Sequence, residues 1–555
     1  MKKLKGITSS KGIALGRGIF INKDTIYVDP FTISDVDNEI DKFLLAQERS
    51  INQLEALYNG LVFKISQDNS MIFKSHQMII KDKDFINKVY HYIKVFKYNA
   101  AYAIFKASQD YIVLFKNVKS EYISQRSDDI KDIMRRLIDN ISDENKKDDF
   151  NINEEGILFT QELMPSEILT IDKEKISGIV TKYGGKTSHT SILAKSMGIP
   201  MIIGVNFDIN EIKDKFIILD GILEEVIVSP DDKTITEYLK KQEDIKENEQ
   251  RLKLTVYEPD YTLDKKEIEI MANITTSNDV DNALENGAKG IGLFRSEFLY
   301  IDRQSGPSEE ELFNEYKSAL MKSDNKEVII RTIDLGSDKN MSYIKYSKEP
   351  NPALGLRALR LCFNHLDIFK TQLRALIRAS VYGKLGLLIP MVVSLSEVIK
   401  VKDLIDEVKK SLYSENMQYN VNIPLGIMIE TPSAVMISDL LAKHVDFFSI
   451  GTNDLVQFTL ACDRDNVSLM EMYTSNHIAI LRMIKTVVDN AHNNNIWVEV
   501  CGEVAGDLTM VDKMVGLGVD RLSVDIQNLL ATKDVIRHTN YIQSRKNVLN
   551  MIYPN

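Results

Sequence analysis

Residues 181–200 read Thr-Lys-Tyr-Gly-Gly-Lys-Thr-Ser-His-Thr-Ser-Ile-Leu-Ala-Lys-Ser-Met-Gly-Ile-Pro. The apolar run before them, residues 176–180, predicts a strand, and the glycine pair at 184–185 ends it. From His189 onward, apolar residues recur at helical spacing until Gly198 and Pro200 stop the helix. We therefore expect His189 in the first turn of a short helix, directly behind a glycine loop.

The first turn of this helix has the composition of a phosphate-binding site. Free backbone N–H groups at a helix start, three neighbouring hydroxyl side chains and the charge of Lys186 all favour an anion. A histidine held there can carry a phosphoryl group as a covalent intermediate. The pattern alone also allows a simpler interpretation, in which His189 only caps or packs the helix.

Composition limits the classes of protein that this chain can represent. Its 555 residues are enough for about three or four domains. No apolar run approaches the roughly 20 residues of a membrane-spanning helix, and the N-terminus lacks the features of a signal peptide. Three cysteines without a Cys-x-x-Cys pair favour a reducing, cytoplasmic location. A net charge of −11 argues against general nucleic-acid binding.

The order of strand-like and helix-like segments divides the first half of the chain. Residues 1–30 and 144–230 hold short strand patterns around the His189 helix and predict one compact α/β domain. Residues 31–143 have almost no glycine or proline and show helical spacing, which predicts an inserted subdomain of antiparallel helices. The alternative is a purely structural bundle. Residues 231–258 are densely charged and predict a solvated linker helix.

Residues 259–555 alternate strand and helix signals. The strand candidates are residues 267–271, 290–294, 327–332, 386–390, 424–429, 446–450, 497–500 and 519–524. Eight such units in roughly 290 residues predict a (β/α)₈ barrel. In that fold the chemistry lies where the strands end, so the residues that follow each strand are the candidates for a site.

Charged and reactive residues follow several of these strands: Arg295, Arg331 with Asp334, Glu430, Asn453 with Asp454, and Cys501. Guanidinium groups clamp a phosphate or a carboxylate bidentately. The carboxylates of Glu430 and Asp454, without nearby His or Cys ligands, suit a hard cation such as Mg²⁺. For each residue taken singly, the alternative is an ordinary salt bridge at the barrel rim.

The same segments resemble a known family. Residues 184–195 resemble the phosphohistidine motif of the phosphoenolpyruvate-utilising enzymes. Segments similar to that family's barrel motifs follow in family order at 292–299, 331–339, 351–360, 426–434, 447–459, 463–464 and 501–507. Pyruvate phosphate dikinase and phosphoenolpyruvate synthase also need a nucleotide-binding domain, which no segment here supplies. The resemblance is therefore to phosphoenolpyruvate–protein phosphotransferase, enzyme I of the bacterial phosphotransferase system.

This resemblance implies a role for each matching residue. His189 takes the phosphoryl group from phosphoenolpyruvate, with release of pyruvate, and passes it to a histidine of the phosphocarrier protein HPr as the first step of sugar transport. Cys501 protonates the enolpyruvate carbon. Glu430 and Asp454 bind Mg²⁺. The residues implied to hold the substrate are Arg295, Arg331, Arg357, Asn453, Asp454 and Arg464.

The resemblance also implies partners and motion. Segments 73–78 and 126–133 look like the helices that dock HPr, while His76 taken alone is more simply a structural residue. The barrel domain at 259–555 is expected to form a homodimer. Because the histidine must visit two sites, its α/β domain is expected to swivel about the linker helix.

Several positions depart from the family's pattern. Lys186 and Lys195 stand where arginine is common, which keeps the charge but loses bidentate geometry. Asp525 adds a negative charge near the end of the eighth strand, close to an anionic substrate. Residues 71–120 carry nine lysines against three aspartates, whereas the family's docking surface is usually acidic. This predicts a carrier with a less basic docking face. It also leaves open a regulatory paralogue that signals through an altered carrier.

Overall fold

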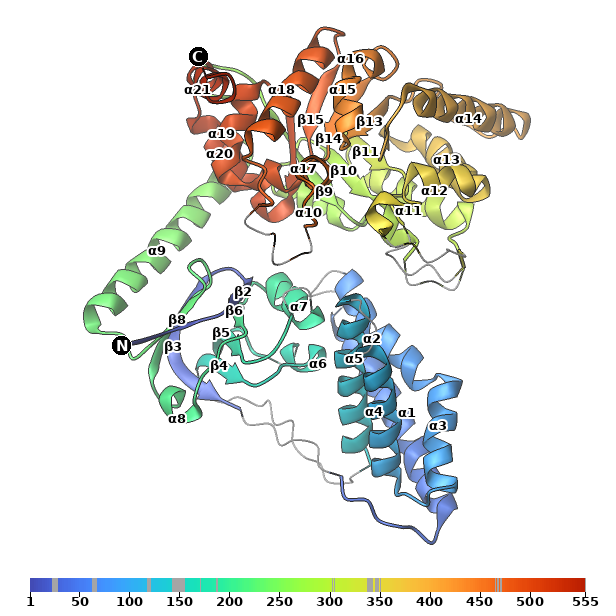
Figure 1. The fold of residues 1–555 in the computed structure, drawn as a ribbon, viewed down its shortest axis with the longest axis vertical. Helices are drawn as coiled ribbons and strands as arrows, with labels where there is room; N and C mark the ends of the chain where they lie inside the picture. Colours follow the sequence, from blue (N-terminus) through green and yellow to red (C-terminus); the bar gives the residue numbers. More distant parts are fainter. Residues whose placement is uncertain are drawn as a thin grey trace. The chain divides into compact units, whose positions relative to one another are not determined.

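The computed structural model describes most of the chain. The described residues are 1–21, 28–61, 67–116, 121–141, 155–169, 171–185, 188–301, 303, 305–336, 343–344, 349, 351–464, 466, 469 and 472–554. They form two compact units, Met1–Glu247 and Asn248–Asn555 (Figure 1). The predicted fold class is confirmed: an α/β domain with an inserted helical subdomain precedes a closed barrel of parallel strands.

A mixed sheet organises the first unit. Within the described residues its strand order is β1-β8-β7-β3-β4-β5-β6-β2, and β3 to β6 run parallel to one another. Strand β6 ends at Ile203, because Gly204 has a φ of +74° that ends the extended backbone. The strands span Lys2–Lys5, Ile7–Ser10, Ile13–Phe20, Gly156–Thr160, Ile176–Thr181, Met201–Ile203, Phe216–Asp220 and Glu225–Val228, for β1 to β8 in order.

Short helices cover this sheet. Helices α6 (Pro165–Ile168) and α7 (His189–Met197) place Ile168, Leu193 and Ala194 in one apolar cluster with side chains of β4 and β5. On α8 (Ile209–Ile212), Ile212 packs into a second cluster with side chains of β7 and β8. The buried apolar runs of the central strands are therefore covered by helices, as parallel strands require.

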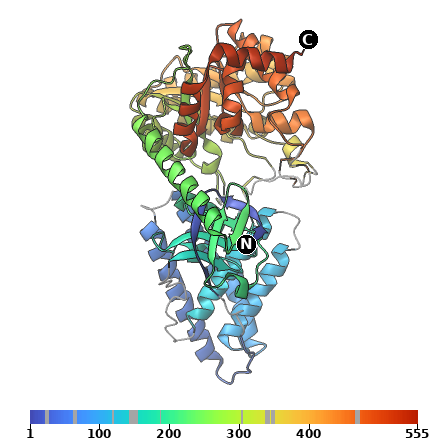
Figure 2. The ribbon, with the colours of Figure 1, turned by 90° about the vertical axis from the view of Figure 1, so that its left-hand side faces the viewer.

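The inserted subdomain lies between β3 and β4 in sequence and forms its own core. Apolar side chains at three- and four-residue spacing meet in one buried cluster that includes Phe43, Phe73 and Phe85. Figures 1 and 2 show the helices running side by side. Their bounds are Val36–Leu61, Gln67–Ile80, Lys83–Lys94, Ala100–Lys116 and Glu121–Asp139, for α1 to α5 in order.

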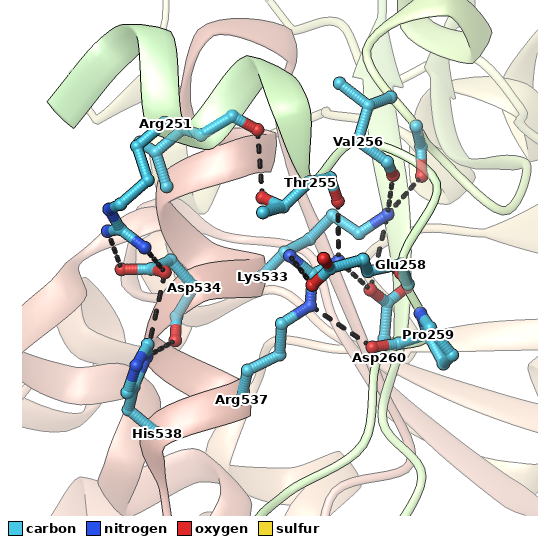
Figure 3. Close-up of polar contacts among 12 residues, drawn as sticks. Arg251, Thr255, Val256, Glu258, Pro259, Asp260, Lys533, Asp534, Arg537 and His538 are labelled. Atoms are coloured by element: carbon cyan, nitrogen blue, oxygen red, sulfur yellow. Dashed lines mark hydrogen bonds and ion pairs between the residues drawn. The ribbon is translucent and has the colours of Figure 1, made fainter. Parts of the chain in front are cut away.

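The charged segment predicted as a linker forms one helix, α9 (Asp232–Leu254), and residues 240–250 of it are exposed. The C-terminal end of α9 is held by α20 (Leu529–His538) of the second unit. Two hydrogen bonds of 2.8 Å join Arg251 to Asp534. The buried ammonium group of Lys533 donates to the Val256 carbonyl at 2.9 Å and pairs with Asp260 at 3.3 Å (Figure 3). Buried charges thus fix this end of the linker.

The second unit is a closed barrel in which β9 to β16 are parallel throughout. Each strand overlaps one predicted candidate. The first begins at Glu269, because Glu267 instead forms an antiparallel bridge with Tyr261. The strands span Glu269–Ile274, Ile291–Arg295, Glu327–Arg331, Lys384–Ile389, Leu425–Ile429, Phe447–Ile450, Trp497–Val500 and Arg521–Asp525, for β9 to β16 in order.

Helices follow the strands and surround the barrel, the arrangement predicted from the alternating pattern. None of the described helices is long and apolar enough to cross a membrane. Besides α20, they are Asp279–Glu285, Glu309–Lys322, Leu359–Asn364, Leu366–Ala379, Leu395–Ser414, Pro432–Met436, Ser438–Leu441, Thr452–Leu460, Ile478–His492 and Leu508–Leu517 for α10 to α19 in order, and Tyr541–Ile552 for α21.

The barrel interior is filled by side chains around two aromatic rings. Phe447 and Trp497 stack with centroids 4.3 Å apart and an interplanar angle of 4°. Gly426 on the neighbouring strand leaves the room for this stack, because a Cβ there would lie 2.2 Å from the Phe447 ring. A Cβ at Gly386, one strand further, would meet nothing closer than an Ile329 carbon at 3.3 Å. A methyl group at position 426 would therefore clash with the stacked rings, whereas one at position 386 would clash far less.

We predict that Gly426→Ala destabilises the protein far more than Gly386→Ala. The methyl group at 426 must displace a stacked ring, and overpacking of this kind costs about 1–3 kcal/mol or more. Urea unfolding followed by the fluorescence of the single tryptophan, Trp497, measures both variants. Equal losses of unfolding free energy in the two variants would contradict this account of the barrel interior.

Candidate active site

The loop before α7 has the capped geometry predicted for a phosphate-binding helix start. The Ser188 hydroxyl is the N-cap and accepts a hydrogen bond from the Ser191 N–H at 3.3 Å. The Ser191 hydroxyl donates to the Gly185 carbonyl at 2.7 Å. Gly184 has a φ of +146°, a conformation that favours glycine. The loop is thus folded tightly against the first turn of the helix.

For three of the predicted phosphate-binding residues, the structure describes the backbone of one and no part of the other two. Lys186 and Thr187 lie outside the described residues, and for His189 the backbone alone is described. His189 is the first residue of α7, as predicted, and the helix ends at Gly198 in the left-handed conformation. The backbone therefore places His189 at the helix start, behind the glycine loop.

A pocket adjoins this loop within the first unit. Asp129, Glu162, Gly184 and Ser188 are among the residues that line it. His76 of α2 is buried, and its Nε2 lies 3.3 Å from an Asp129 carboxylate oxygen. The structure thus places His76 inside the helical subdomain, beside Asp129. Of the two helices predicted to dock HPr, the side chains of residues 126–128 lie outside the description.

At the C-terminal ends of the barrel strands, Arg331 lies between two carboxylates. Its Nη2 atom contacts Glu297 Oε1 at 2.5 Å, and Nη1 contacts Asp334 Oδ2 at 3.0 Å. Burial lowers the pKa of Arg331, but the charges of Glu297 and Asp334 outweigh it and raise the pKa well above its usual value. The Nε–H group has no hydrogen-bond partner among the described residues. One donor of a fully charged guanidinium therefore remains unused.

A second arginine, Arg357, joins Asp334 to Asp454. Its Nε donates to Asp334 Oδ1 at 2.9 Å, and its Nη2 donates to Asp454 Oδ2 at 3.0 Å. Burial raises the pKa of Asp334, but the charges of Arg331 and Arg357 prevail and hold it at about 2. The nearby charge of Arg464 acts in the same direction. Four of the predicted rim residues thus share one electrostatic network with Asp334.

Glu430 lies next to this network and is buried. Its Oε1 atom accepts a hydrogen bond from the Met391 N–H at 2.5 Å. Burial, followed by the charges of Asp454 and Asp334, raises the pKa of Glu430 to about 8, although Arg331 opposes the rise. Among the described residues, no group of three or more His, Cys, Asp and Glu side chains is arranged to hold a metal ion. Protein carboxylates alone therefore provide an incomplete coordination sphere.

Asn453 and Arg295 complete the set at the rim. The Asn453 amide donates to Glu503 Oε1 at 3.1 Å and accepts from the Glu503 N–H at 3.0 Å, which ties the start of α17 to the loop after β15. The Tyr473 hydroxyl donates to the Asn453 carbonyl at 2.9 Å. Within the described part of the chain, the Arg295 side chain makes no hydrogen bond or ion pair. Its guanidinium is therefore available to an anion.

Cys501 lies at the end of β15 and is buried. Its Sγ lies 3.6 Å from the Ile450 carbonyl oxygen, to which the thiol donates. Burial and the charge of Glu499 raise the pKa of Cys501 to about 12, while a hydrogen bond with Ser449 and the charge of Arg331 oppose the rise. At neutral pH the thiol therefore holds its proton, as a general acid must.

Sequence reasoning missed the residues that orient the arginines. Glu297 was passed over although it follows Arg295 by two positions. Gln372 of α13 is fully buried; it donates to the Ser296 hydroxyl at 2.9 Å and accepts from the Ile333 N–H at 3.0 Å. Ser296 in turn donates to the Arg331 carbonyl at 2.6 Å. A glutamine in an otherwise apolar helix face was the available signal for this network.

Comparison with known proteins covers nearly the whole chain. Three family models match it in order: the N-terminal domain of PEP-utilising enzymes at residues 5–126, the mobile domain at 152–223, and the PEP-binding domain at 249–541. The PEP-binding model alone therefore matches more than half of the chain, and it includes every rim residue described above.

Similar proteins are named phosphoenolpyruvate-protein phosphotransferase. The chain is 37% identical to the one from Staphylococcus carnosus strain TM300, over 97% of this chain and 94% of that protein. It is 38% identical to the one from Mycoplasma capricolum, over 98% of this chain and 95% of that protein. The protein from Bacillus subtilis strain 168 is 36% identical over 97% of this chain. At this identity and coverage, the chain belongs to the phosphoenolpyruvate-protein phosphotransferase family.

Proposed function

We propose that this chain transfers the phosphoryl group of phosphoenolpyruvate to its own His189 and from there to a histidine of the phosphocarrier protein HPr. Pyruvate is released in the first of these two steps. The observation that carries the proposal is the network at the barrel rim, where Arg331 and Arg357 share Asp334 and the charge of Arg331 acts on the thiol of Cys501. Cationic clamps next to a proton donor suit an anionic enol ester.

The substrate's phosphate and carboxylate are held by the rim arginines. Arg331 has an unused Nε–H, and Arg295 is without partners in the described structure. Arg357, Arg464, Asn453 and Asp454 complete the binding site. Because phosphoryl transfer depends mainly on positioning and charge stabilisation, these contacts carry most of the catalytic effect. They also orient the phosphorus for attack by His189.

Glu430 and Asp454 are the proposed Mg²⁺ ligands. Their donor atoms fit a hard cation. Burial is the main cause that raises the pKa of Glu430, and the charges of Asp454 and Asp334 add a repulsion that a divalent ion would relieve. Two carboxylates leave the remaining coordination positions to substrate oxygens and water. When bound, Mg²⁺ supplies charge screening between the phosphate and the carboxylate of the substrate. In this arrangement Arg357 contacts both Asp454 and the substrate.

Cys501 gives its proton to the enolpyruvate carbon as the phosphorus–oxygen bond breaks. A C–H bond forms, an S–H bond breaks, and pyruvate leaves. Arg331, whose charge lowers the pKa of the thiol, stabilises the thiolate that remains. His189 lies in the first unit and the rim in the second, so the transfer requires the two units to bring these groups together.

The partner side of the proposal rests on the helical subdomain. HPr docks there, and four lysines in this region lie over tyrosine rings, Lys74 over Tyr58 at 4.2 Å being one. Such contacts hold the ammonium groups over ring faces, and the region keeps its positive charge, which fits a carrier with a less basic docking face. We further propose a cytoplasmic homodimer that associates through the barrel unit. The names of the relatives favour this transport role over the regulatory alternative.

We predict that the chain, incubated with labelled phosphoenolpyruvate and Mg²⁺, acquires one acid-labile label on His189. His189→Ala should abolish the label, because no other side chain is placed at a phosphate-binding helix start in the proposed site. His91→Ala, an exposed histidine of the same unit, is the matched control and should label like the wild type. Acid-labile label that persists in His189→Ala would refute the assignment.

We also predict that Asp525→Asn lowers the KM for phosphoenolpyruvate. Asp525 is exposed at the end of β16, where its negative charge repels an anionic substrate, and removing one such charge is worth about threefold to tenfold in KM. Asp324→Asn, the same change before the start of β11, is the control and should leave KM unaltered. Steady-state kinetics of both variants measure this, and identical KM values would contradict the repulsion.

A further inference from the structure

A carboxyl group that the proposed mechanism does not use lies inside the barrel. Glu499 is on β15, two residues before Cys501, so both side chains point to the barrel interior. It is 0% exposed. A Cβ added to Gly292 would lie 2.3 Å from Glu499 Oε2 and 2.5 Å from the Ser523 hydroxyl. The absence of a side chain at 292 is therefore what gives the Glu499 carboxyl its space.

The charges around Glu499 do not pair with it. Arg521 on β16 is committed to Glu269 of β9 and Glu327 of β11, and its guanidinium stacks over the Trp497 ring at 3.8 Å. Glu499 Oε2 has no hydrogen-bond partner among the described residues. Burial raises the pKa of Glu499 to about 8, although Arg521 opposes the rise. An unpaired carboxyl in this position is stable when it carries a proton.

One hydroxyl group lies between Glu499 and the thiol of Cys501. Ser449 is the register partner of Glu499 on β14, and its hydroxyl donates to Glu499 Oε1 at 3.3 Å. Cys501 follows Glu499 by two residues, so its side chain lies on the same face of the barrel as this hydroxyl, and Ser449 lowers the pKa of the thiol. Carboxyl, hydroxyl and thiol thus follow one another from the barrel interior toward the rim. A hydroxyl can pass a proton because it donates and accepts at once.

We propose that Glu499 is a proton store that restores the Cys501 thiol through the Ser449 hydroxyl after each proton transfer to the substrate. This inference rests on the proposed role of Cys501. The Cys501 thiolate takes the proton of the Ser449 hydroxyl, whose oxygen takes the proton of the Glu499 carboxyl. One S–H bond forms, one carboxyl O–H bond breaks, and the serine is unchanged. A solvent proton restores Glu499 between turnovers. Glu499 acts through Cys501 and does not touch the substrate.

The alternative is that Glu499 only fills the space above Gly292. Glu499→Gln separates the two, because glutamine has the same volume and still accepts a hydrogen bond, but it cannot store a proton. Ser449→Ala is the second variant, which removes the bridge and leaves the carboxyl. Thermal unfolding of both variants shows whether each is folded before its kinetics are compared.

The kinetic test is the pH dependence of steady-state pyruvate formation by the full chain over many turnovers, with HPr as the phosphoryl acceptor, because Glu499 acts only after the first proton transfer. It is recorded from pH 6.5 to 9.5 with saturating Mg²⁺ and phosphoenolpyruvate. The wild-type rate should fall as pH rises through about 8, while Glu499→Gln should be about tenfold slower at neutral pH and lack that fall. The pKa of Glu430 is also raised to about 8. Because Glu430 is present in both proteins, only a difference between the two pH profiles reports on Glu499. Superimposable profiles would overturn the proposal.

A second readout requires no turnover. The infrared S–H stretching band of Cys501, assigned by its loss in Cys501→Ser, should move in both Glu499→Gln and Ser449→Ala because its hydrogen bonding changes. A band unmoved in both variants would overturn the relay. A wild type that forms no pyruvate would instead overturn the proposed function, and the band then still reports whether Glu499 and Cys501 are connected.

Discussion

The ion pairs of Arg357 with Asp334 and Asp454 are the interaction on which the barrel rim depends. They join the loop after β11 to the start of α17, two segments that are 120 positions apart in sequence (454 − 334). Asp334 also forms an ion pair with Arg331, and Glu297 forms a second ion pair with the same guanidinium group. Taking these charges out of water is costly, so the proposed binding of an anionic substrate explains the network better than a contribution to stability does.

The barrel backbone brings the residues of this network together, and glycines at a few positions leave room for the side chains inside the barrel. Parallel strands bring all their C-terminal ends to one rim, so residues distant in sequence become neighbours there. Gly426 admits the Phe447–Trp497 stack, and Gly292 admits the Glu499 carboxyl. The interior also holds the buried carboxyl group of Glu499, two residues before Cys501 on β15. Packing and chemistry in this barrel are therefore set by the same positions.

Much of this architecture was predictable from the sequence, because buried parallel strands are short apolar runs that end at charged residues. The helix start at His189 was predictable from its cap and glycines. Contacts between elements were not predictable. No local pattern indicates that Glu297 pairs with Arg331, or that Gln372 lies near the strand ends. In the run Trp-Val-Glu-Val at 497–500, alternation suggests a solvent-facing glutamate, and only barrel closure turns Glu499 inward.

The central claim is that the Arg357 network binds the substrate. Titration calorimetry of phosphoenolpyruvate into the full chain with Mg²⁺ tests it most directly. The account predicts that Arg357→Gln binds at least about tenfold more weakly than the wild type, whereas Arg378→Gln, which removes an arginine paired with Glu309 and Glu310 on the outer helices, binds normally. Equal affinity of Arg357→Gln and the wild type would contradict the account.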